Sequence, residues 1–336
     1  MKLLRVIGAC AVVAAVLLPL SVSAQETTFK FLTGWDQRFP GTPLIAYEYG
    51  KILDKATNGR MKAQFFGPET VAPNQQFEPI SRGVFDMSYS TPVYFLGTTG
   101  LPTVAFALEA NTENWRKKGY WDIFDQELQR FNQKLIAFVA AGTAYQLMLT
   151  KPLDQGEKPL AGRKIRANGF YKGLVEPGGG AMVNLDGGEI YAALQKGVVD
   201  GAAWPVLGAI NFKWFEVAKY MSRPLWGVAP YTVTMNLDRF NKLSKADQEL
   251  VLKLGREVEA SGSKGYEAQT QVEAKELKEK GVQETHFDPK TFATLQAGFD
   301  RAVWNLAIGG NAKTKDRVME FYAKAKANGD APASLE

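Results

Sequence analysis

Apolar and polar positions in the first third of the chain follow the rhythm of alternating strands and helices. Short apolar runs bounded by turn residues predict strands at residues 27–32, 61–66 and 84–89. Residues 44–56 carry apolar side chains at helical spacing and end at Asn58-Gly59, a usual helix terminus, and residues 75–81 predict a shorter helix. This order of elements predicts right-handed crossovers and a mostly parallel sheet.

The same rhythm returns further along the chain and predicts a second α/β unit. A helix from Asn111 and a strand at residues 135–140 complete the first unit. The second unit is expected to contain strands at residues 163–167, 181–185 and 198–203 and a helix at residues 188–195. Residues 231–236 predict a strand that could return to the first unit. Helices follow, from the capping residue Ser244 towards Lys280 and again over residues 290–327.

These two units predict an α/β clamshell of two lobes. We expect lobe I in residues 25–148 with a returning segment near 230–243, the core of lobe II in residues 149–229, and helices that pack across both lobes in residues 244–336. Ligands of open α/β sheets bind at the carboxyl ends of the strands. When two lobes face each other, those ends line a shared cleft, which is the architecture of a binding protein.

Residues 1–24 have the layout of a secretory signal peptide. Lys2 and Arg5 precede an apolar run, Val6–Leu20, and the small residues Val22-Ser23-Ala24 stand where a signal peptidase cleaves. The run is shorter than the ~20 apolar residues that a membrane span needs. We therefore expect this segment to be removed on export to the periplasm.

Composition narrows the chemistry that this chain can perform. Its 336 residues include 40 Lys and Arg against 35 Asp and Glu, one Cys (Cys10) and one His (His286). Loss of the signal segment removes the cysteine and two cations, so the formal charge falls from +5 to +3. Thiolate and multi-histidine metal sites are excluded, and we expect no metal or other cofactor. No Lys/Arg-rich stripe indicates a nucleic-acid partner.

Motifs of enzyme chemistry are absent from the sequence. The one dense glycine run, Gly178-Gly179-Gly180, lacks the spacing of a nucleotide-binding loop and is typical of a turn before a strand. His286 has no nucleophile that the sequence places beside it. A mechanism with two carboxylates stays open, since Asp and Glu are plentiful, but no spacing singles out a pair. We expect no catalytic residues and keep an exported enzyme as the alternative.

Arg166 is the leading candidate for an anion anchor. It follows a short apolar strand and precedes Asn168, so both side chains are expected at the carboxyl end of that strand, facing the cleft. A guanidinium is permanently charged and grips a carboxylate through two parallel hydrogen bonds. A surface or interdomain salt bridge would also place an arginine here. Glu78 is expected near the cleft, where it either accepts a ligand hydroxyl or is solvated.

Aromatic residues recur at the ends of the predicted strands. They are Trp35, Tyr94, Phe95, Tyr145, Phe170, Trp204 and Trp226. Any single one would more often belong to a core than to a site. As a set that faces one cleft they would form apolar walls. Together with Arg166 they suit an organic acid with an apolar or aromatic body.

Two segments resemble the signature region of the solute-binding proteins of tripartite ATP-independent periplasmic (TRAP) transporters, the DctP-type family. They are Leu160-Ala-Gly-Arg-Lys-Ile-Arg166 and Glu189-Ile-Tyr-Ala-Ala-Leu-Gln195-Lys-Gly-Val-Val-Asp200-Gly201, and residues 82–86, 215–220 and 243–244 fit the same pattern. The resemblance implies a periplasmic-binding-protein clamshell with a long helix across both lobes, a salt bridge from Arg166 to the substrate carboxylate, and Trp204 in the pocket. It also implies a TRAP permease, driven by an ion gradient, as the partner. We expect the binding protein to be a monomer.

Departures from that family narrow the expected ligand. Members that bind acidic sugars often carry another arginine shortly after a Gly-Thr pair, whereas Gly142-Thr143 is followed by Ala144-Tyr145. Members that chelate a metal with a 2-oxo acid have acidic residues where this chain has Ala203 and Val228. The expectation is a monocarboxylate bound without metal. The alternative ligands are a dicarboxylate or a sugar acid. The alternative partner is a sensory receptor in place of the permease.

Overall fold

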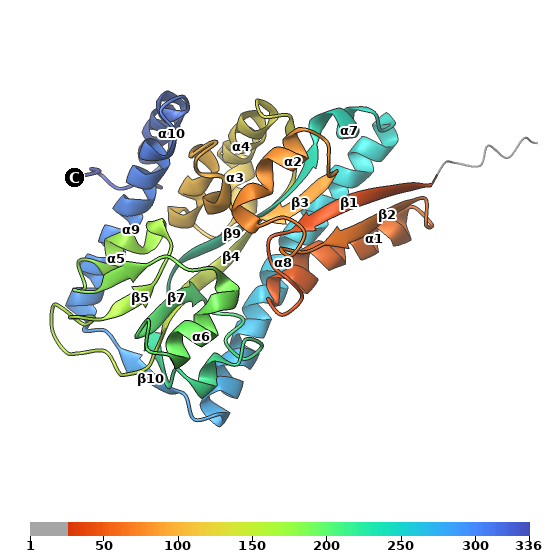
Figure 1. Ribbon diagram of the computed structural model, residues 1–336. Coiled ribbons are helices and arrows are strands. Elements are labelled where there is room, and N and C mark those ends of the chain that lie inside the picture. Colours follow the sequence, from red (N-terminus) through yellow and green to blue (C-terminus); the bar gives the residue numbers. More distant parts are fainter. Residues whose placement is uncertain (1–25) are drawn as a thin grey trace, which may run out of the picture.

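The computed structural model describes residues 26–336, and its centre is one mixed β-sheet (Figure 1). The strands are β1 (Thr27–Thr33), β2 (Met61–Phe66), β3 (Met87–Ser90), β4 (Gln133–Leu149), β5 (Lys164–Arg166), β6 (Ala181–Val183), β7 (Gly201–Pro205), β8 (Tyr220–Arg223), β9 (Trp226–Asn236) and β10 (Gln283–His286). Eight lie in the order β2-β1-β3-β9-β4-β7-β5-β6, while β8 pairs with β4 and β10. Five of the nine strand pairs in residues 26–336 are parallel, so the expected mostly parallel α/β architecture is confirmed. The expected signal peptide, residues 1–24, lies outside the described residues.

β4 and β9 run through both halves of the sheet and join them. β9 pairs with β3 of the first half, and with β4 from the pair Gln133–Asn236 to the pair Tyr145–Trp226. The end of β4 then pairs with β7 of the second half. Both strands are longer than the predicted residues 135–140 and 231–236. Cross-strand pairing extends them, and this is a tertiary effect that a local pattern does not contain.

Helices surround this sheet. They are α1 (Glu48–Ala56), α2 (Phe77–Ser81), α3 (Thr112–Lys117), α4 (Tyr120–Gln129), α5 (Lys172–Val175), α6 (Ile190–Gln195), α7 (Leu237–Asn241), α8 (Lys245–Glu279), α9 (Pro289–Gly310) and α10 (Lys315–Ala327). All but α5 and α7 lie in segments where the periodicity predicts a helix. A π-helical turn, Thr42–Tyr47, leads into α1. Gly83 after α2 has φ of 72°, a conformation that glycine adopts easily. This turn occupies the residues before Met87, so β3 begins later than the predicted residue 84.

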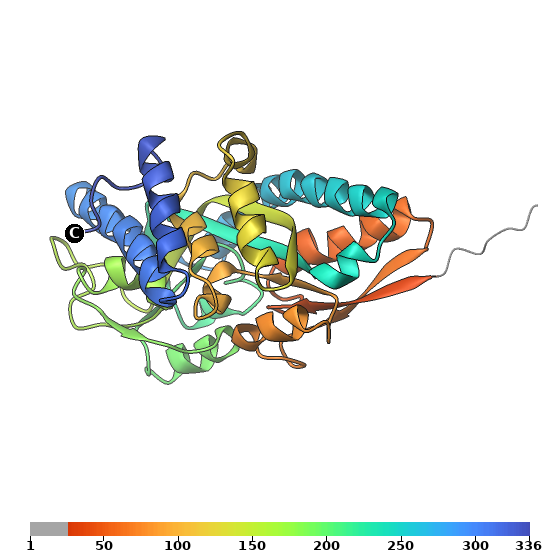
Figure 2. The same cartoon turned by 90° about the horizontal axis from the view of Figure 1, so that it is seen from above.

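α8 crosses the molecule along one face of the sheet (Figures 1 and 2). The Ser244 side chain accepts the backbone N–H of Asp247 and caps the helix, as predicted. At Gly255 the helix touches β4 so closely that a Cβ would lie 2.0 Å from the carbonyl oxygen of Ile136. The other end of α8 reaches the segment after β7 through Glu273. The expected long helix across both lobes is thus confirmed.

None of the helices in residues 26–336 is both long enough and apolar enough to cross a membrane.

Candidate functional site

The two halves of the sheet enclose a cavity lined mainly by aromatic rings. It holds about 350 Å³ of empty space, counted out to its mouth. Its lining residues are Trp35, Thr91, Val93, Tyr94, Phe106, Tyr145, Arg166, Asn168, Phe170, Tyr171, Trp204, Pro205 and Tyr231. Most of them lie at or just after the ends of β1, β3, β5 and β7 or on the two shared strands, and Phe106 comes from the 3-10 helical segment Leu101–Ala107. The cavity therefore lies where the carboxyl ends of the parallel strands of both halves converge.

Arg166 ends β5 and is the one cationic side chain of this lining. It is 2% exposed. Its Nε donates to the carbonyl oxygen of Leu185 at 2.9 Å, and Nη1 donates to that of Ala203 at 3.4 Å. The guanidinium carbon lies 5.0 Å from the ring centre of Trp204, a cation–π contact. These contacts hold the guanidinium in one orientation at the wall of the cavity.

No carboxylate in residues 26–336 forms an ion pair with Arg166. Burial lowers the pKa of its guanidinium, and Tyr94, Tyr171 and Asp186 raise that pKa by a smaller amount. Arginine nevertheless keeps its charge in proteins. A buried charge is expensive unless it is paired. The site can therefore bind a small anion that supplies the missing charge.

Asn168 follows the strand end and contacts the arginine directly. Its Oδ1 accepts a hydrogen bond from Arg166 Nη2 at 3.4 Å. The contact is long, so it orients the guanidinium more than it neutralises it. The amide nitrogen of Asn168 is available as a second donor at the same wall.

The rings pack into two connected groups on opposite walls. On one wall Trp35 lies 5.3 Å from Tyr94 and 5.8 Å from Tyr231, centre to centre. On the other, Phe170 lies 4.4 Å from Phe106 and 5.5 Å from Tyr145. Such tilted contacts are typical of stable aromatic clusters. The walls are therefore preformed surfaces suited to an apolar or flat ligand body.

Four phenols lie in these walls and all are neutral at physiological pH. Burial raises the pKa of Tyr94 to about 12, and the Arg166 charge opposes part of that rise. Burial also raises the pKa of Tyr145, Tyr171 and Tyr231 well above the ordinary value. The hydroxyls of Tyr94, Tyr145 and Tyr171 are thus neutral donors that could bind a polar group of a ligand, whereas that of Tyr231 donates to Tyr266.

Of the nine residues predicted for the site, seven line this cavity. They are Arg166, Trp204, Asn168, Tyr145, Trp35, Phe170 and Tyr94. The sequence reasoning missed Thr91, Val93, Phe106, Tyr171, Pro205 and Tyr231. Tyr171 adjoins a predicted residue and Tyr231 opens the predicted returning strand, so both had a signal. Phe106 had none, because it lies in a 3-10 helical segment, Leu101–Ala107, with no strand end nearby.

The structure corrects the placement of Glu78. This side chain is 67% exposed on α2 and pairs with Arg82 at 2.5 Å, one helical turn away. It lies away from the cavity because α2 presents that face to solvent. Of the two alternatives for Glu78, the solvated one fits.

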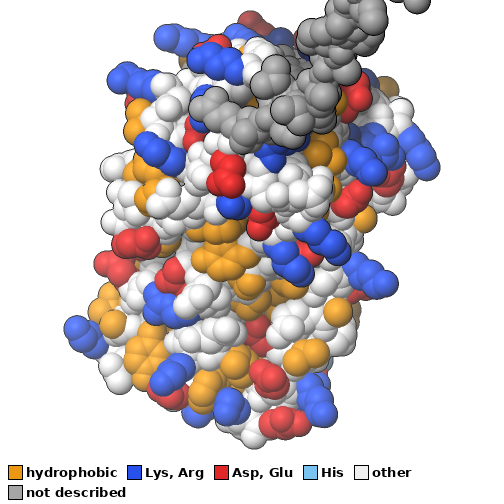
Figure 3. All heavy atoms as spheres, turned by 90° about the vertical axis from the view of Figure 1, so that its right-hand side faces the viewer, with side chains coloured by type: hydrophobic (Ala, Val, Ile, Leu, Met, Phe, Trp, Pro, Cys, Tyr) orange, Lys and Arg blue, Asp and Glu red, His pale blue; other side chains and the backbone are white. Residues whose placement is uncertain are grey.

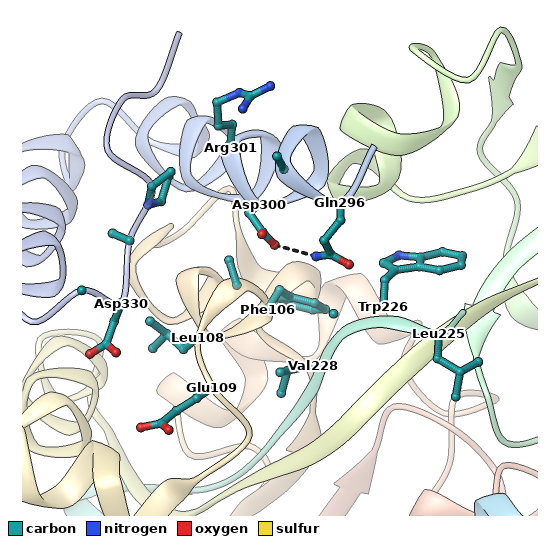
Figure 4. Close-up of a pocket in the computed structure, with 16 residues that line it drawn as sticks. Phe106, Leu108, Glu109, Leu225, Trp226, Val228, Gln296, Asp300, Arg301 and Asp330 are labelled. Atoms are coloured by element: carbon teal, nitrogen blue, oxygen red, sulfur yellow. Dashed lines mark hydrogen bonds between the residues drawn. The ribbon is translucent and has the colours of Figure 1, made fainter. Parts of the chain in front are cut away.

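Trp226 also lies outside the cavity, one layer behind it. Its ring packs edge-on against Tyr171 at 6.5 Å between centres. Its other side borders a broad, open hollow between β9, α9 and the C-terminal tail, with Gln296 and Asp300 above it (Figure 4). Trp226 begins β9 on the same strand as Tyr231, and Gly227 between them has φ of 65°, a left-handed conformation that interrupts the regular alternation of side chains.

On one face of the molecule, charged side chains of both signs are mixed. The face drawn in Figure 3 interleaves basic and acidic side chains. Within residues 26–336 no three His, Cys, Asp or Glu side chains gather in a way that could hold a metal ion. The cavity with Arg166 is therefore the site on which the functional argument rests.

Comparison with protein families finds one matching model over most of the chain. Residues 45–308 match bacterial extracellular solute-binding protein, family 7. A similar curated protein is the outer membrane transporter protein TsaT of Comamonas testosteroni, 24% identical over 93% of this chain and 95% of that protein. Another is the monocarboxylate 2-oxoacid-binding periplasmic protein of Nostoc, 27% identical over 66% of this chain and 63% of that protein.

Solved structures with the same fold are also numerous. A TRAP periplasmic solute-binding protein from Desulfovibrio salexigens with bound orotic acid has a TM-score of 0.79 at 18% identity, over 90% of this chain and 99% of that one. A TRAP solute-binding protein from Rhodoferax ferrireducens with bound malonate has a TM-score of 0.75 at 19% identity, over 89% of this chain and 98% of that one. At these identities the likeness establishes the two-lobed fold.

Proposed function

Because this chain belongs to family 7 of the bacterial extracellular solute-binding proteins, we propose that it captures a monocarboxylate with an apolar or aromatic body for a TRAP permease. The family is periplasmic, binds organic acids and consists of transport proteins, not enzymes. The ligand class, the export signal and the monomeric state are the parts of the proposal that go beyond the family.

The unpaired, buried guanidinium of Arg166 carries the proposal. A carboxylate bound there would receive two parallel hydrogen bonds and would neutralise a charge that is otherwise costly to bury. Trp204 stacks on the guanidinium and would cover the bound group from one side. A surface salt bridge, the alternative for an arginine at this strand end, is not what its partners support.

The remaining lining favours one anionic group per ligand. Beyond Arg166 the lining residues include no Lys, Arg or His. The similar Nostoc protein is named for monocarboxylates, and orotic acid, in the Desulfovibrio protein, is a flat ring with one carboxylate. Malonate in the Rhodoferax protein supports a dicarboxylate as the second candidate.

A thermal-shift panel tests the ligand class directly. Benzoate, phenylacetate, orotate and butyrate would be compared with malonate and glucuronate, each with and without calcium. A ligand that binds only the folded state raises the melting temperature through mass action. We expect the monocarboxylates with a ring to stabilise most, independently of calcium. Stabilisation by malonate or glucuronate alone, or only with calcium, would contradict the proposal.

Delivery to a permease requires export and release of an unchanged ligand. Residues 1–24 have the pattern of an export signal. We expect periplasmic fractionation of the full chain to yield a mature protein beginning at Gln25 and eluting as a monomer. Mass spectrometry of the mature N-terminus and of the acid recovered after binding tests both points.

A further inference from the structure

The C-terminal half of α8 contacts the segment that packs behind Trp204 in the cavity lining. The Glu273 carboxylate is 1% exposed. Both of its oxygens accept the backbone N–H of Gly208 at 2.9 Å, and Oε1 also accepts that of Ile210 at 3.1 Å. We propose that Glu273 is a positioning residue for ligand binding, which fixes residues 206–212 and through them Trp204. Only the identity of the ligand in this inference rests on the proposed function.

Residues 206–212 are in direct contact with Trp204. At Gly208, φ is 111°, and a Cβ there would lie 3.5 Å from Trp204 Nε1. Phe212 and Trp214 meet the Trp204 ring edge-on, at 6.1 and 5.3 Å between centres. Trp204 in turn lies against the Arg166 guanidinium. A shift of this segment would therefore move the surface on which the carboxylate is expected to sit.

The same helix also contacts Tyr231, a second residue of the cavity lining. Tyr266 lies seven residues before Glu273, two turns away, so both side chains project from one face of α8. The Tyr231 hydroxyl donates to the Tyr266 hydroxyl at 3.3 Å, and Tyr231 lines the cavity from β9. Two polar side chains of one helix thus contact two parts of the cavity lining, Tyr231 directly and Trp204 through residues 206–212.

Glu273 titrates near neutral pH, which makes its role measurable. Burial raises the pKa of its carboxyl to about 7, and the backbone N–H groups of Gly208, Ile210 and Ala209 oppose part of this rise. Glu276 on the same helix raises this pKa further, and Tyr266 faces the carboxyl from the preceding turns. Residues 206–212 contain no charged side chain, and the next one, Lys213, is exposed. Protonation puts an O–H where Gly208 offers an N–H, so it weakens the hydrogen bonds between Glu273 and residues 206–212.

A looser segment lowers ligand affinity by lowering the population of the competent conformation. When only a fraction of the protein has the binding geometry, the apparent Kd rises in inverse proportion to that fraction. The backbone hydrogen bonds lower the Glu273 pKa, so loosening the segment while the carboxyl stays buried raises that pKa, and deprotonation favours the ordered segment. Global unfolding exposes the carboxyl and therefore has the opposite pH dependence. Affinity for a monocarboxylate should then be higher at pH 8 than at pH 6. A carboxylate ligand and arginine keep their charges across this range.

The first test needs no ligand. The protein is labelled with 5-fluorotryptophan, and the Trp204 fluorine resonance is assigned with Trp204→Phe and followed from pH 5.5 to 8.5. All variants carry His286→Asn, which removes the single histidine of the chain. We expect a midpoint near pH 7 that is lost in Glu273→Gln and kept in Glu267→Gln, an exposed glutamate of the same helix.

A Trp204 resonance that does not titrate overturns the inference, and this holds even if Glu273→Gln fails to fold. A titration that persists in a folded Glu273→Gln variant also overturns it. The second test measures benzoate binding by calorimetry at pH 6 and pH 8. We expect about fivefold tighter binding at pH 8 in the parent and in Glu267→Gln, and weak, pH-independent binding in Glu273→Gln. If the parent does not bind benzoate at either pH, the ligand proposal fails, and the fluorine titration alone decides the role of Glu273.

Discussion

At the scale of single residues, Arg166 and Glu273 both bury an ionisable group, and their hydrogen-bond partners indicate different roles. Glu273 meets backbone N–H donors within the described chain, whereas Arg166 meets only carbonyl and amide oxygens and a ring. The hydrogen bonds to Glu273 compensate its negative charge and position residues 206–212. The partners of Arg166 in the described chain include no carboxylate, so its positive charge could be paired by the ligand that we propose.

Replacing Arg166 should therefore separate binding from stability. In Arg166→Gln we expect carboxylate affinity to fall by at least 30-fold, because loss of one partner of a buried charge pair costs about 2–5 kcal/mol. The unliganded variant should melt within a few degrees of the parent, since no ion pair is broken in the described structure. Calorimetry and thermal melts of both proteins measure the two effects. A variant that is strongly destabilised yet still binds would assign Arg166 a structural role.

The raised pKa of Glu273 also predicts how stability depends on pH. Its carboxyl has a pKa of about 7 in the fold against 4.5 ordinarily, so the folded state takes up the proton more readily. The stability from this group is complete below pH 4.5 and is lost as the pH rises through about 7. A tenfold change in proton affinity is worth about 1.36 kcal/mol, so the loss in the free energy of unfolding is on the order of 3 kcal/mol.

The difference between the parent and Glu273→Gln isolates this contribution from that of other groups. Urea melts at pH 4.5, 6 and 8 should show the parent losing stability relative to the variant as pH rises. A parallel pH dependence in the two proteins would show that the carboxyl does not titrate in the fold with a raised pKa.

At the scale of elements, α8 depends on close contact with β4 more than on helix propensity. Gly255 and Gly265 both lie within the helix, where alanine is the better helix former by about 1 kcal/mol. A Cβ at Gly255 would collide with the Ile136 backbone at 2.0 Å, whereas one at Gly265 meets only the flexible end of Leu44 at 3.1 Å. The two positions should respond in opposite directions.

We expect Gly255→Ala to destabilise the protein by about 1–3 kcal/mol, the range of overpacked cores. Gly265→Ala is the matched control and should be neutral or slightly stabilising. Chemical denaturation at one pH measures both. Equal effects of the two substitutions would mean that α8 can shift on β4 at little cost, and the idea of a rigid helix spanning both walls would lose its basis.

At the scale of the whole molecule, β4 and β9 are the connections about which two lobes could close. A ligand that touches both walls stabilises the closed state only through its differential affinity for that state. Spin labels at Thr70→Cys in the first half and Lys196→Cys in the second, both exposed, would report closure in a Cys10→Ser background. We expect benzoate to shorten the mean distance between the two labels and to narrow its distribution. The pair Thr70→Cys and Asp122→Cys lies within the first half and should not change; a change there would indicate a general rearrangement.

The sequence by itself determined the alternation of strands and helices, the start of α8 and the arginine that lines the cavity, because these depend on local periodicity, capping and charge. Met61–Phe66 was predicted at its observed bounds, and Ser244 caps the long helix as expected. Arg166 was found because its strand and its charge are both visible locally. Trp204 was among the aromatic residues at strand ends, and the family resemblance implied its place in the pocket.

Only the tertiary structure decided which aromatic residues share the cavity and how its walls are held. Trp226 and Tyr231 lie on the same strand, yet Tyr231 lines the cavity and Trp226 lies behind it. Phe106 enters from a segment without strand pattern. Glu273 reaches Gly208 across 65 residues of sequence. Contacts of this kind arise from how distant segments meet, and no local pattern of side chains contains that information.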